Sequence, residues 1–439
     1  MAKQPIAVEI RSFQVGFGDC FLLSFVYSAK DKRHVLIDFG TTALPRKGKP
    51  SAAMPEIARQ IRAVCSAGGG GDGRLTALVA THRHADHVSG FGTDSRTGRS
   101  GEIIKALRPK LVLQPWTEDP AAKPDARRAT RPKGGRKGFV AALASMNDLA
   151  ARVERLAASR PAGMSAAVRK ELAFLGADNI ANKSAIDNLI AMGKAKGARS
   201  RYLAYGDRSG LEALLPGVKV HVLGPPDLTQ TEKTRKQRSR DPDQFWHLVA
   251  GAAPARPIAD AAPKAKADKA RPVPVEARWF RDRLQSMTGQ GLLEIVRQLD
   301  QQMNNTSLIL LFEVFGKKLL FPGDAQIENW SYALIDAPDS AEVRELLADV
   351  DFYKVGHHGS LNATPRQLLW QKFRKRKGRE LQTMVSTMRG KHGHPESRTE
   401  VPRRTLVQAL EAGSRLKSTQ DLKAKETSHL VTIVPGDGT

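Results

Sequence analysis

A predicted strand that runs directly into a cluster of histidines constrains this chain more than any other feature. Residues 75–80 are mainly apolar and read as a buried strand, and the sequence THRHADH occupies residues 81–87 immediately after it. Because side chains alternate along an extended chain, His82 and His84 project to one side of the strand end. The turn that follows brings Asp86 and His87 towards the same point. Three imidazoles and a carboxylate within six residues predict a metal-binding site.

The donor types in this cluster narrow the choice of metal. Imidazole with carboxylate suits Zn(II), Mn(II) or Fe(II), and the lack of thiolate ligands favours a catalytic over a structural site. The chain contains only two cysteines, Cys20 and Cys65, so it offers neither a disulfide framework nor a cysteine-based zinc site. The alternative, a polar loop with chance histidines, is disfavoured because chains rarely place so many histidines where no ligand requires them.

Two later clusters also stand at the ends of predicted strands. Asp324 closes the sequence FPGD, where a carboxylate can bridge two metal ions. A Gly-Asp pair after a strand is more often only a turn, so this signal is weak by itself. His357 and His358 belong to the sequence YKVGHHGS of residues 353–360. A lone histidine pair is usually structural, but the first cluster makes a second group of ligands the better interpretation.

The remaining periodicities indicate an α/β fold. Strand-like alternation marks residues 7–13, and a glycine-containing turn leads into predicted strands at 21–26 and 34–38. Apolar residues then recur at helical spacing across residues 54–64, before the strand at 75–80. No repeat of fixed period is found, which argues against a solenoid. The later part continues with predicted strands at 308–312, 318–321, 352–355, 382–386 and 430–434 and predicted helices at 327–335, 341–347 and 402–412.

Composition and periodicity divide the chain into two parts with an α/β pattern and a middle part that mostly lacks this pattern. Residues 1–118 and 301–439 carry the α/β pattern, and one further strand is expected within residues 216–228. Residues 119–215 are mainly helical in pattern and include a basic loop, which predicts a helical basic insertion. Residues 229–300 are rich in Ala, Pro, Lys and Arg with little periodicity, which predicts a low-complexity, partly disordered insertion.

The charge balance points to anionic partners. The chain carries 70 Lys and Arg against 45 Asp and Glu, a net charge of +25, and such a field attracts polyanions. More than half of the excess lies in residues 119–300. Basic runs at 131–137, 233–240 and 372–379 could follow a phosphate backbone, although each run alone is equally well a solvated face. We expect a nucleic acid or another polyanion as partner, and no particular protein partner is indicated.

The sequence contains no expected membrane segment. Its longest apolar runs, such as residues 308–312, are far shorter than the roughly 20 residues that a spanning helix needs. The first ten residues lack the apolar region of a secretory signal. We therefore expect a cytoplasmic protein.

Taken together, these motifs resemble the metallo-β-lactamase fold family. The sequence HRHADH has the form HxHxDH, and it is accompanied by a strand end Asp38-Phe-Gly40, by Gly-Asp at 323–324 and by HHGS at 357–360. A narrower likeness is to the hydrolase-like domain of the ComEC competence proteins, through VGFGD at 15–19, LGPP at 223–226, NNTS at 304–307, PGD at 322–324, KVGHHGS at 354–360 and GHP at 393–395. The likeness covers about residues 5–118 and 215–439 and implies an αββα sandwich with basic insertions. Because this chain has no membrane segments, a role in DNA uptake does not follow.

The resemblance also implies roles for single residues. It places His82 and His84 at one metal ion, Asp86 and His87 at a second, and Asp324 between the two. One of His357 and His358 is a further ligand; His358 is preferred, with His357 contacting substrate phosphate. It also implies supporting residues. Asp38 would hydrogen-bond the first histidines on the side away from the metal, and His394 would line the pocket. Ser360 and Asn362 would hydrogen-bond substrate oxygens. Asp86, His357 and His394 form the implied catalytic set.

One departure from the wider family concerns the number of metal ions. The family has a further histidine between HxHxDH and the bridging Asp, and this chain offers only His221 and His247 there. His221 lies inside a predicted strand and reads as a packed or edge residue, and His247 lies in the poorly patterned segment. The resemblance therefore implies one or two divalent ions, Zn(II) first and Mn(II) as the alternative.

Hydrolysis is the expected reaction, because a bound divalent ion lowers the pKa of water and polarises a phosphoryl or carbonyl oxygen. The leading hypothesis is a metal-dependent phosphodiesterase or nuclease that uses metal-activated hydroxide. The alternatives are a hydrolase of a small ester, thioester or phosphorylated metabolite, since fold does not fix function, and a non-catalytic nucleic-acid-binding module. Tight, steeply salt-dependent binding to nucleic acid separates the nuclease from the small-substrate enzyme.

Overall fold

The computed structural model describes residues 3–45, 48–67, 74–120, 182–231, 303–374, 380–393, 395–396, 399–423 and 426–435. Most of the two predicted insertions lies outside these residues, together with the basic runs at 131–137 and 233–240. His247 and His394 also lie outside them.

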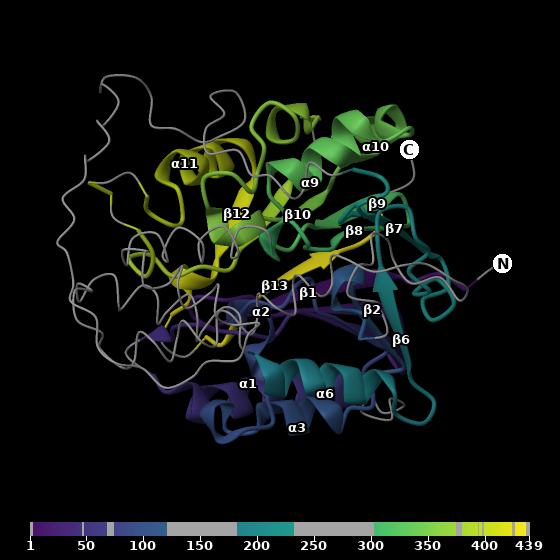
Figure 1. The fold of residues 1–439 in the computed structure, drawn as a ribbon, viewed down its shortest axis with the longest axis vertical. Coiled ribbons are helices and arrows are strands. Elements are labelled where there is room, and N and C mark those ends of the chain that lie inside the picture. The colour runs from purple at the N-terminus through teal and green to yellow at the C-terminus, as the bar shows by residue number, and fades with distance from the viewer. Residues whose placement is uncertain are drawn as a thin grey trace, which may run out of the picture.

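Within the described residues, the strands form two mixed sheets that lie one above the other (Figure 1). The first sheet has the order β13 (Ser428–Ile433), β1 (Ala7–Phe13), β2 (Phe21–Ser28), β3 (Asp31–Ile37), β4 (Ala77–Val79), β5 (Leu111–Pro115), β6 (Arg199–Leu203). The second has the order β12 (Arg415–Ser418), β11 (Gln382–Val385), β10 (Phe352–Lys354), β9 (Lys317–Phe321), β8 (Ile309–Val314), β7 (Val218–Gly224). The α/β class expected from the sequence is confirmed.

Helices cover the outer face of each sheet (Figure 1). Against the first sheet lie α1 (Pro50–Ser66), α3 (Ser100–Lys105) and α6 (Lys183–Gly193), and against the second lie α9 (Ile327–Ser331), α10 (Ser340–Ala348) and α11 (Arg404–Gly413). The sequence explains α1 well: Pro50 opens the helix, where its missing N–H costs nothing, and Met54, Ile57 and Ile61 recur on the buried side. A short helix, α2 (Ala85–Val88), lies at one end of the first sheet.

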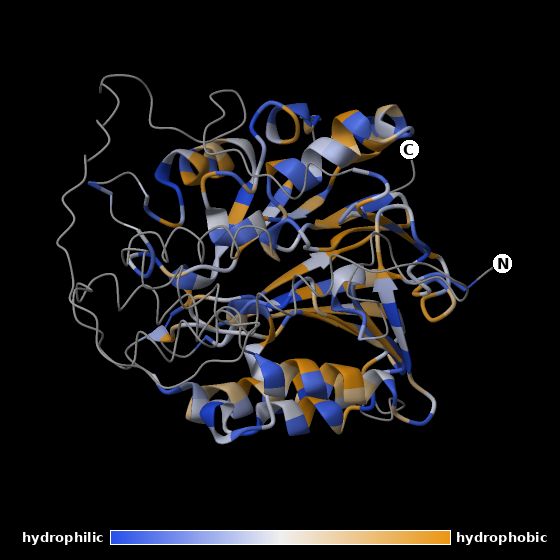
Figure 2. Cartoon of the chain, viewed as in Figure 1, coloured by the Kyte–Doolittle hydropathy of each residue, from blue (hydrophilic) through white to orange (hydrophobic). Residues whose placement is uncertain are grey.

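The main hydrophobic core lies between the two sheets. Phe21, Leu23 and Phe25 of β2 face the second sheet, whereas Leu22 between them packs with the helices on the outside. This alternation is the two-residue period of a strand that is buried on both faces. Figure 2 shows hydrophobic residues along the strands of both sheets.

The two halves of the chain repeat one topology. Strands β1 to β3 pair antiparallel, and β3 to β6 pair in parallel; β7 to β9 and β9 to β12 repeat these two patterns. Consequently β3 and β4 correspond to β9 and β10. Loops that leave the carboxyl ends of parallel strands are the usual place for ligand-binding residues.

Most strands and helices expected in 1–118 and 301–439 are confirmed, with boundaries moved by up to four residues. One difference concerns the end of the predicted helical insertion. Although α6 is helical, β6 belongs to the first sheet, and Leu211 and Leu215 pack between the sheets. The ordered domain therefore extends into residues 119–215. No helix among the described residues has the length and apolar character needed to cross a membrane.

Candidate metal centre

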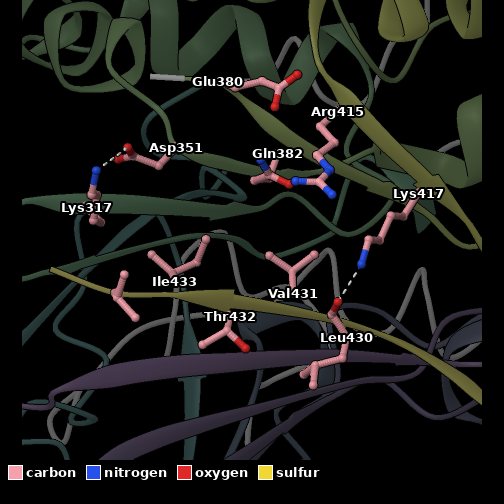
Figure 3. Close-up of a pocket in the computed structure, with 11 residues that line it drawn as sticks. Lys317, Asp351, Glu380, Gln382, Arg415, Lys417, Leu430, Val431, Thr432 and Ile433 are labelled. Atoms are coloured by element: carbon pink, nitrogen blue, oxygen red, sulfur yellow. Dashed lines mark hydrogen bonds and ion pairs between the residues drawn. The ribbon is translucent and has the colours of Figure 1, made fainter. Parts of the chain in front are cut away.

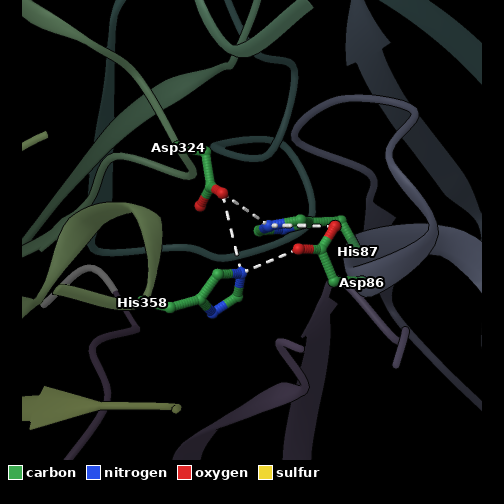
Figure 4. Close-up of side chains that lie close together, drawn as sticks. All are labelled: Asp86, His87, Asp324 and His358. Carbon is green, nitrogen blue, oxygen red and sulfur yellow. Dashed lines mark hydrogen bonds and ion pairs between the residues drawn. The ribbon is translucent and has the colours of Figure 1, made fainter. Parts of the chain in front are cut away.

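Four side chains from both halves of the chain converge in the interior (Figure 4). Asp86 and His87 come from α2, Asp324 follows β9, and His358 follows β10. One ligand atom from each of the four lies within 4.8 Å of the others. All four residues are buried, and their donors are two imidazole nitrogens and two carboxylate oxygens. This is a suitable set for Zn(II) or Mn(II).

Each imidazole of this group is oriented by an acceptor behind it. Nδ1 of His87 lies 2.8 Å from Oδ2 of Asp38, and Nδ1 of His358 lies 2.9 Å from the carbonyl oxygen of Ser386. Carboxylate and carbonyl oxygens only accept, so Nδ1 is the donor in both rings. In a neutral ring, Nε2 then carries the lone pair that a metal ion requires.

Both Nε2 atoms point at carboxylates. Nε2 of His87 lies 3.1 Å from Oδ2 of Asp324, and Nε2 of His358 lies 3.1 Å from Oδ2 of Asp86 (Figure 4). A lone pair facing a carboxylate is repulsive unless a cation lies between them. Either protons on both rings or a metal ion satisfies the arrangement, and metal binding would release those protons.

The pKa values follow the same electrostatics. Burial lowers the pKa of His87, but the carboxylates of Asp324 and Asp38 outweigh it and raise the pKa well above the usual value. Burial raises the pKa of Asp86, yet the hydrogen bond to His358 and the charge of His87 bring it below its ordinary value. The four groups therefore form an anionic pocket that holds positive charge.

His82 and His84 lie beside this group rather than within it. Nε2 of His82 is 3.0 Å from Nδ1 of His84, and the rings of His82 and His87 are 4.2 Å apart. Burial and the neighbouring charges of His87 and His84 lower the pKa of His82 well below its usual value. The structure thus groups Asp86 and His87, the ligands expected for the second ion, with Asp324. His82 and His84, the pair expected for the first ion, lie next to this group.

Asp38 supports a different histidine from the ones expected. Its carboxylate accepts hydrogen bonds from the backbone N–H and the hydroxyl of Thr81, both at 2.7 Å, and from Nδ1 of His87. It reaches His82 only through the Thr81 hydroxyl, which is 3.2 Å from Nδ1 of His82. The reason is positional: Asp38 has a left-handed backbone (φ 56°) at the end of β3, next to the strand that precedes Thr81.

A buried lysine that the sequence interpretation did not assign lies behind the carboxylates. Lys354 is 2% exposed, forms an ion pair with Asp19 and donates to the carbonyl oxygen of Gly323 at 3.0 Å. Its Nζ is 3.6 Å from Oδ1 of Asp324. Burial lowers the pKa of Lys354, but Asp19 and Asp324 outweigh it, so the pKa is raised and the amine stays charged. Asp19 belongs to the VGFGD motif and Lys354 to the KVGHHGS motif. These two motifs were the sequence signal that could have identified the ion pair.

His357 lies at the opening of the group. Its backbone is left-handed (φ 44°), and its N–H donates to Oδ1 of Asp324 at 3.1 Å. Its side chain is 25% exposed, against 12% for Asp86 and none for His87 and His358. Burial lowers the pKa of His357 to about 4, so its ring is neutral at pH 7, and its Nδ1 has no hydrogen-bond partner among the residues that the structure describes.

The remaining residues that the sequence suggested as candidates lie in different parts of the structure. Ser360 donates its N–H to the carbonyl oxygen of His357, and its hydroxyl lies 3.4 Å from Oδ1 of Asn362. His221 lies on β7 and contacts Glu313 of β8 at 3.2 Å, so it is a cross-strand residue. His392, which the sequence interpretation did not single out, packs at a tilt against Phe17, with ring centroids 4.2 Å apart, and the ring of Phe17 lies 4.5 Å from that of His358.

A separate cavity of about 410 Å³ lies between the amino ends of strands β9 to β12 of the second sheet and strand β13 of the first sheet (Figure 3). Its charges are mixed: Lys317 pairs with Asp351 at 3.5 Å, and Lys417 donates to the carbonyl oxygen of Leu430 at 2.6 Å. Glu380 and Arg415 also line it. No histidine stands among its described lining residues, so we do not assign it to the metal centre.

No protein-family model matches the chain, and none of the curated proteins matches it either.

Proposed function

We propose that this protein is a metal-dependent hydrolase with a metallo-β-lactamase-like αββα sandwich, and that its substrates are phosphodiesters. The single observation that carries the proposal is the orientation of His87 and His358. Their Nδ1 atoms are held by Asp38 and Ser386, and their Nε2 atoms face the carboxylates of Asp324 and Asp86. Two buried imidazoles whose Nε2 atoms face carboxylates at the carboxyl ends of strands need positive charge between them, which supports a site for a divalent cation.

Each residue of the site then has a defined task. Asp86, His87, Asp324 and His358 would hold the ion, with His82 and His84 available for a second one. When bound, the ion would lower the pKa of a water molecule and polarise the oxygen of the scissile group. Asp38 fixes the tautomer of His87, and the positive charge of Lys354 offsets part of the carboxylate charge.

A phosphodiester substrate is favoured by charge and by the residue at the opening. The net charge of +25 attracts anionic substrates. The side chain of His357 is more exposed than those of Asp86, His87 and His358. Its ring is neutral and can hydrogen-bond a phosphoryl oxygen. Hydrolysis of a small ester, thioester or phosphorylated metabolite is the alternative reaction for the same metal centre.

The test is hydrolysis by the full-length protein loaded with Zn(II) or Mn(II). The substrates are bis(p-nitrophenyl) phosphate, single-stranded DNA, duplex DNA, RNA and p-nitrophenyl acetate. Asp86→Asn keeps the size of the side chain but removes a charged oxygen donor, so we expect it to lower the rate at least about 100-fold, the effect of losing a few kcal/mol of transition-state stabilisation.

The matched control for this test is Asp94→Asn. Asp94 caps a short turn and pairs with Arg96 at 2.9 Å, outside the group of ligands, so its rate should stay near that of the wild type. Cleavage of the acetate ester alone would move the assignment to small esters. A metal-loaded wild type that cleaves none of these substrates would refute the hydrolase.

A further inference from the structure

A basic cavity lies at the end of the first sheet that is opposite the metal centre. It has a volume of about 500 Å³ and is formed by the loops at the amino ends of β4, β5 and β6. The metal ligands instead follow the carboxyl ends of β4, β9 and β10. In Figure 1 the turn between α6 and β6 and the short helix α2 lie at opposite ends of the sheet. The charged residues that line this cavity are Arg74, Lys105, Arg108, Lys110 and Lys196.

The charge of this cavity is not balanced by its own lining. Among the described residues, five basic and no acidic ones line it, whereas the cavity between the second sheet and β13 combines three basic with two acidic residues. Among the described residues, Lys105, Arg108, Lys110 and Lys196 form no ion pair, and all four are exposed. Clustered like charges repel each other, so an anion at this place would stabilise the fold.

The negative ends of two helix dipoles offset only part of the positive charge of this cavity. α3 ends at Lys105 and α6 ends at Gly193, and the carbonyl groups of a helix C-terminus carry roughly half a negative charge. Two such ends offset about one of five positive charges. Arg108 also has a left-handed backbone (φ 46°), which is uncommon for a non-glycine residue. Of the four charges on Lys105, Arg108, Lys110 and Lys196, about three therefore remain without a partner among the described residues.

We propose that this cavity is a second binding surface for the phosphate backbone of a nucleic acid, away from the metal centre. The inference rests on the proposed phosphodiesterase function for its choice of nucleic acid, and it adds the surface that holds the polymer. A lipid surface fits less well, because membrane-bound surfaces insert apolar side chains beside their basic ones. The exposed large apolar residues of the described chain are Ile6, Ile335, Leu430 and Val434, and none of them lines this cavity.

The experiment removes four of these charges and measures binding without catalysis. The variant Lys105→Gln, Arg108→Gln, Lys110→Gln, Lys196→Gln is compared with the wild type by fluorescence anisotropy, with a labelled 20-base-pair DNA and a labelled 20-nucleotide RNA in EDTA. We expect at least tenfold weaker binding at about 100 mM salt. For the duplex, the slope of log K against log salt should fall by about 3, since each phosphate contact contributes about 0.9.

The control variant removes the same charge from other exposed places. Lys30→Gln, Lys49→Gln, Lys219→Gln, Arg404→Gln also replaces three lysines and one arginine, all exposed and outside the cavity, the metal centre and the basic runs of the sequence. Its binding should stay within about threefold of the wild type, because screening weakens charges far from the contact. Equal losses in the two variants would overturn the proposal, and so would vesicles of phosphatidylserine that bind the surface while DNA and RNA do not.

The same variants separate this inference from the proposed function. Hydrolysis of bis(p-nitrophenyl) phosphate needs only the metal centre, so the four-residue variant should retain it. If the wild type binds nucleic acid through this cavity but hydrolyses no substrate, the surface stands and the phosphodiesterase fails. If hydrolysis is present and the variant binds DNA and RNA as tightly as the wild type, only the surface is refuted. Thermal unfolding of both variants confirms that they fold.

Discussion

At the scale of single residues, the direction in which an imidazole presents its lone pair is decided by the group behind it. Asp38 and the Ser386 carbonyl hold Nδ1 of His87 and of His358, and this leaves Nε2 of each ring for a cation. Acceptors of this kind commonly govern the metal affinity of their histidines. Substitution of a residue that holds a ligand histidine should therefore change metal affinity, just as substitution of the ligand itself should.

Asp38→Asn should weaken metal binding about 10- to 100-fold, the usual effect of losing such a partner. The amide can donate to Nδ1 of His87, which would favour the tautomer with a proton on Nε2. The measurement is competition for Zn(II) with a chromogenic chelator. Asp31→Asn is the control, because Asp31 lies at the other end of β3 and pairs with Arg33 at 3.2 Å. Unchanged affinity in Asp38→Asn would show that the tautomer is set elsewhere.

A second residue-scale prediction concerns pH and does not involve the metal centre. His34 is 2% exposed and contacts the Ser24 hydroxyl at 2.8 Å, and its burial together with Lys32 lowers its pKa from 6.5 to about 4. Between these pH values the unfolded chain binds a proton that the folded protein does not. Stability is therefore fully present above about pH 6.5 and falls as the pH drops towards 4, by up to about 3 kcal/mol.

The measurement for this prediction is urea unfolding of the wild type and of His34→Asn at several pH values from 7.5 to 4.5. The variant has no group that titrates at this position, so its stability should decline less than that of the wild type below pH 6.5. Parallel curves would show that His34 does not contribute to the acid sensitivity.

At the scale of elements, the site depends on the two sheets packing face to face. Phe312 of β8 is fully buried between them, with its ring 5.9 Å from Phe25 of the first sheet and 5.9 Å from Phe321 of β9. Loss of such a ring leaves a cavity that a close-packed core fills poorly. The strands thus fix the distance between the loops that carry the ligands.

Phe312→Ala should destabilise the protein by about 3–5 kcal/mol, as expected for a large buried aromatic residue. Urea unfolding measures the free energy. Ile335→Ala is the control: Ile335 is 53% exposed, so its loss should change the stability by less than about 0.5 kcal/mol. Similar values for both variants would contradict the face-to-face core.

At the scale of the whole molecule, the metal centre joins the two halves of the chain. Asp86 and His358 are 272 residues apart and follow strands of different sheets, β4 and β10. An ion held by both halves binds the folded protein and not the unfolded chain. Binding of this type adds about 2.7 kcal/mol of stability when the free ion is at 100 times its Kd.

Zn(II) or Mn(II) should therefore raise the Tm of the wild type, and EDTA should reverse the rise. Asp324→Asn removes a ligand that contacts both histidines of the group, so its metal-dependent rise should be largely lost, whereas Asp94→Asn should keep it. Differential scanning calorimetry with and without the ion measures this shift. An equal rise in wild type and Asp324→Asn would exclude the assigned ligand set.

The sequence by itself determined the features that depend on local spacing. Alternating and helical periods located most strands and helices of 1–118 and 301–439, and the residue types at strand ends pointed to Asp86, His87, Asp324 and the pair His357–His358, of which the family resemblance preferred His358. Hydropathy also predicted no membrane-spanning helix, and no helix in the described part of the chain is long and apolar enough to cross a membrane.

Only the tertiary structure decided the features that join distant parts of the chain. It paired Asp38 with His87, placed Lys354 behind Asp324, added β6 to the first sheet and gathered basic residues from three loops into one cavity. No repeat is visible in the sequence, yet the two halves share one strand topology. The physical reason is that periodicity reports which side of an element is buried, whereas contacts between elements depend on the sheet order and on how the two sheets pack.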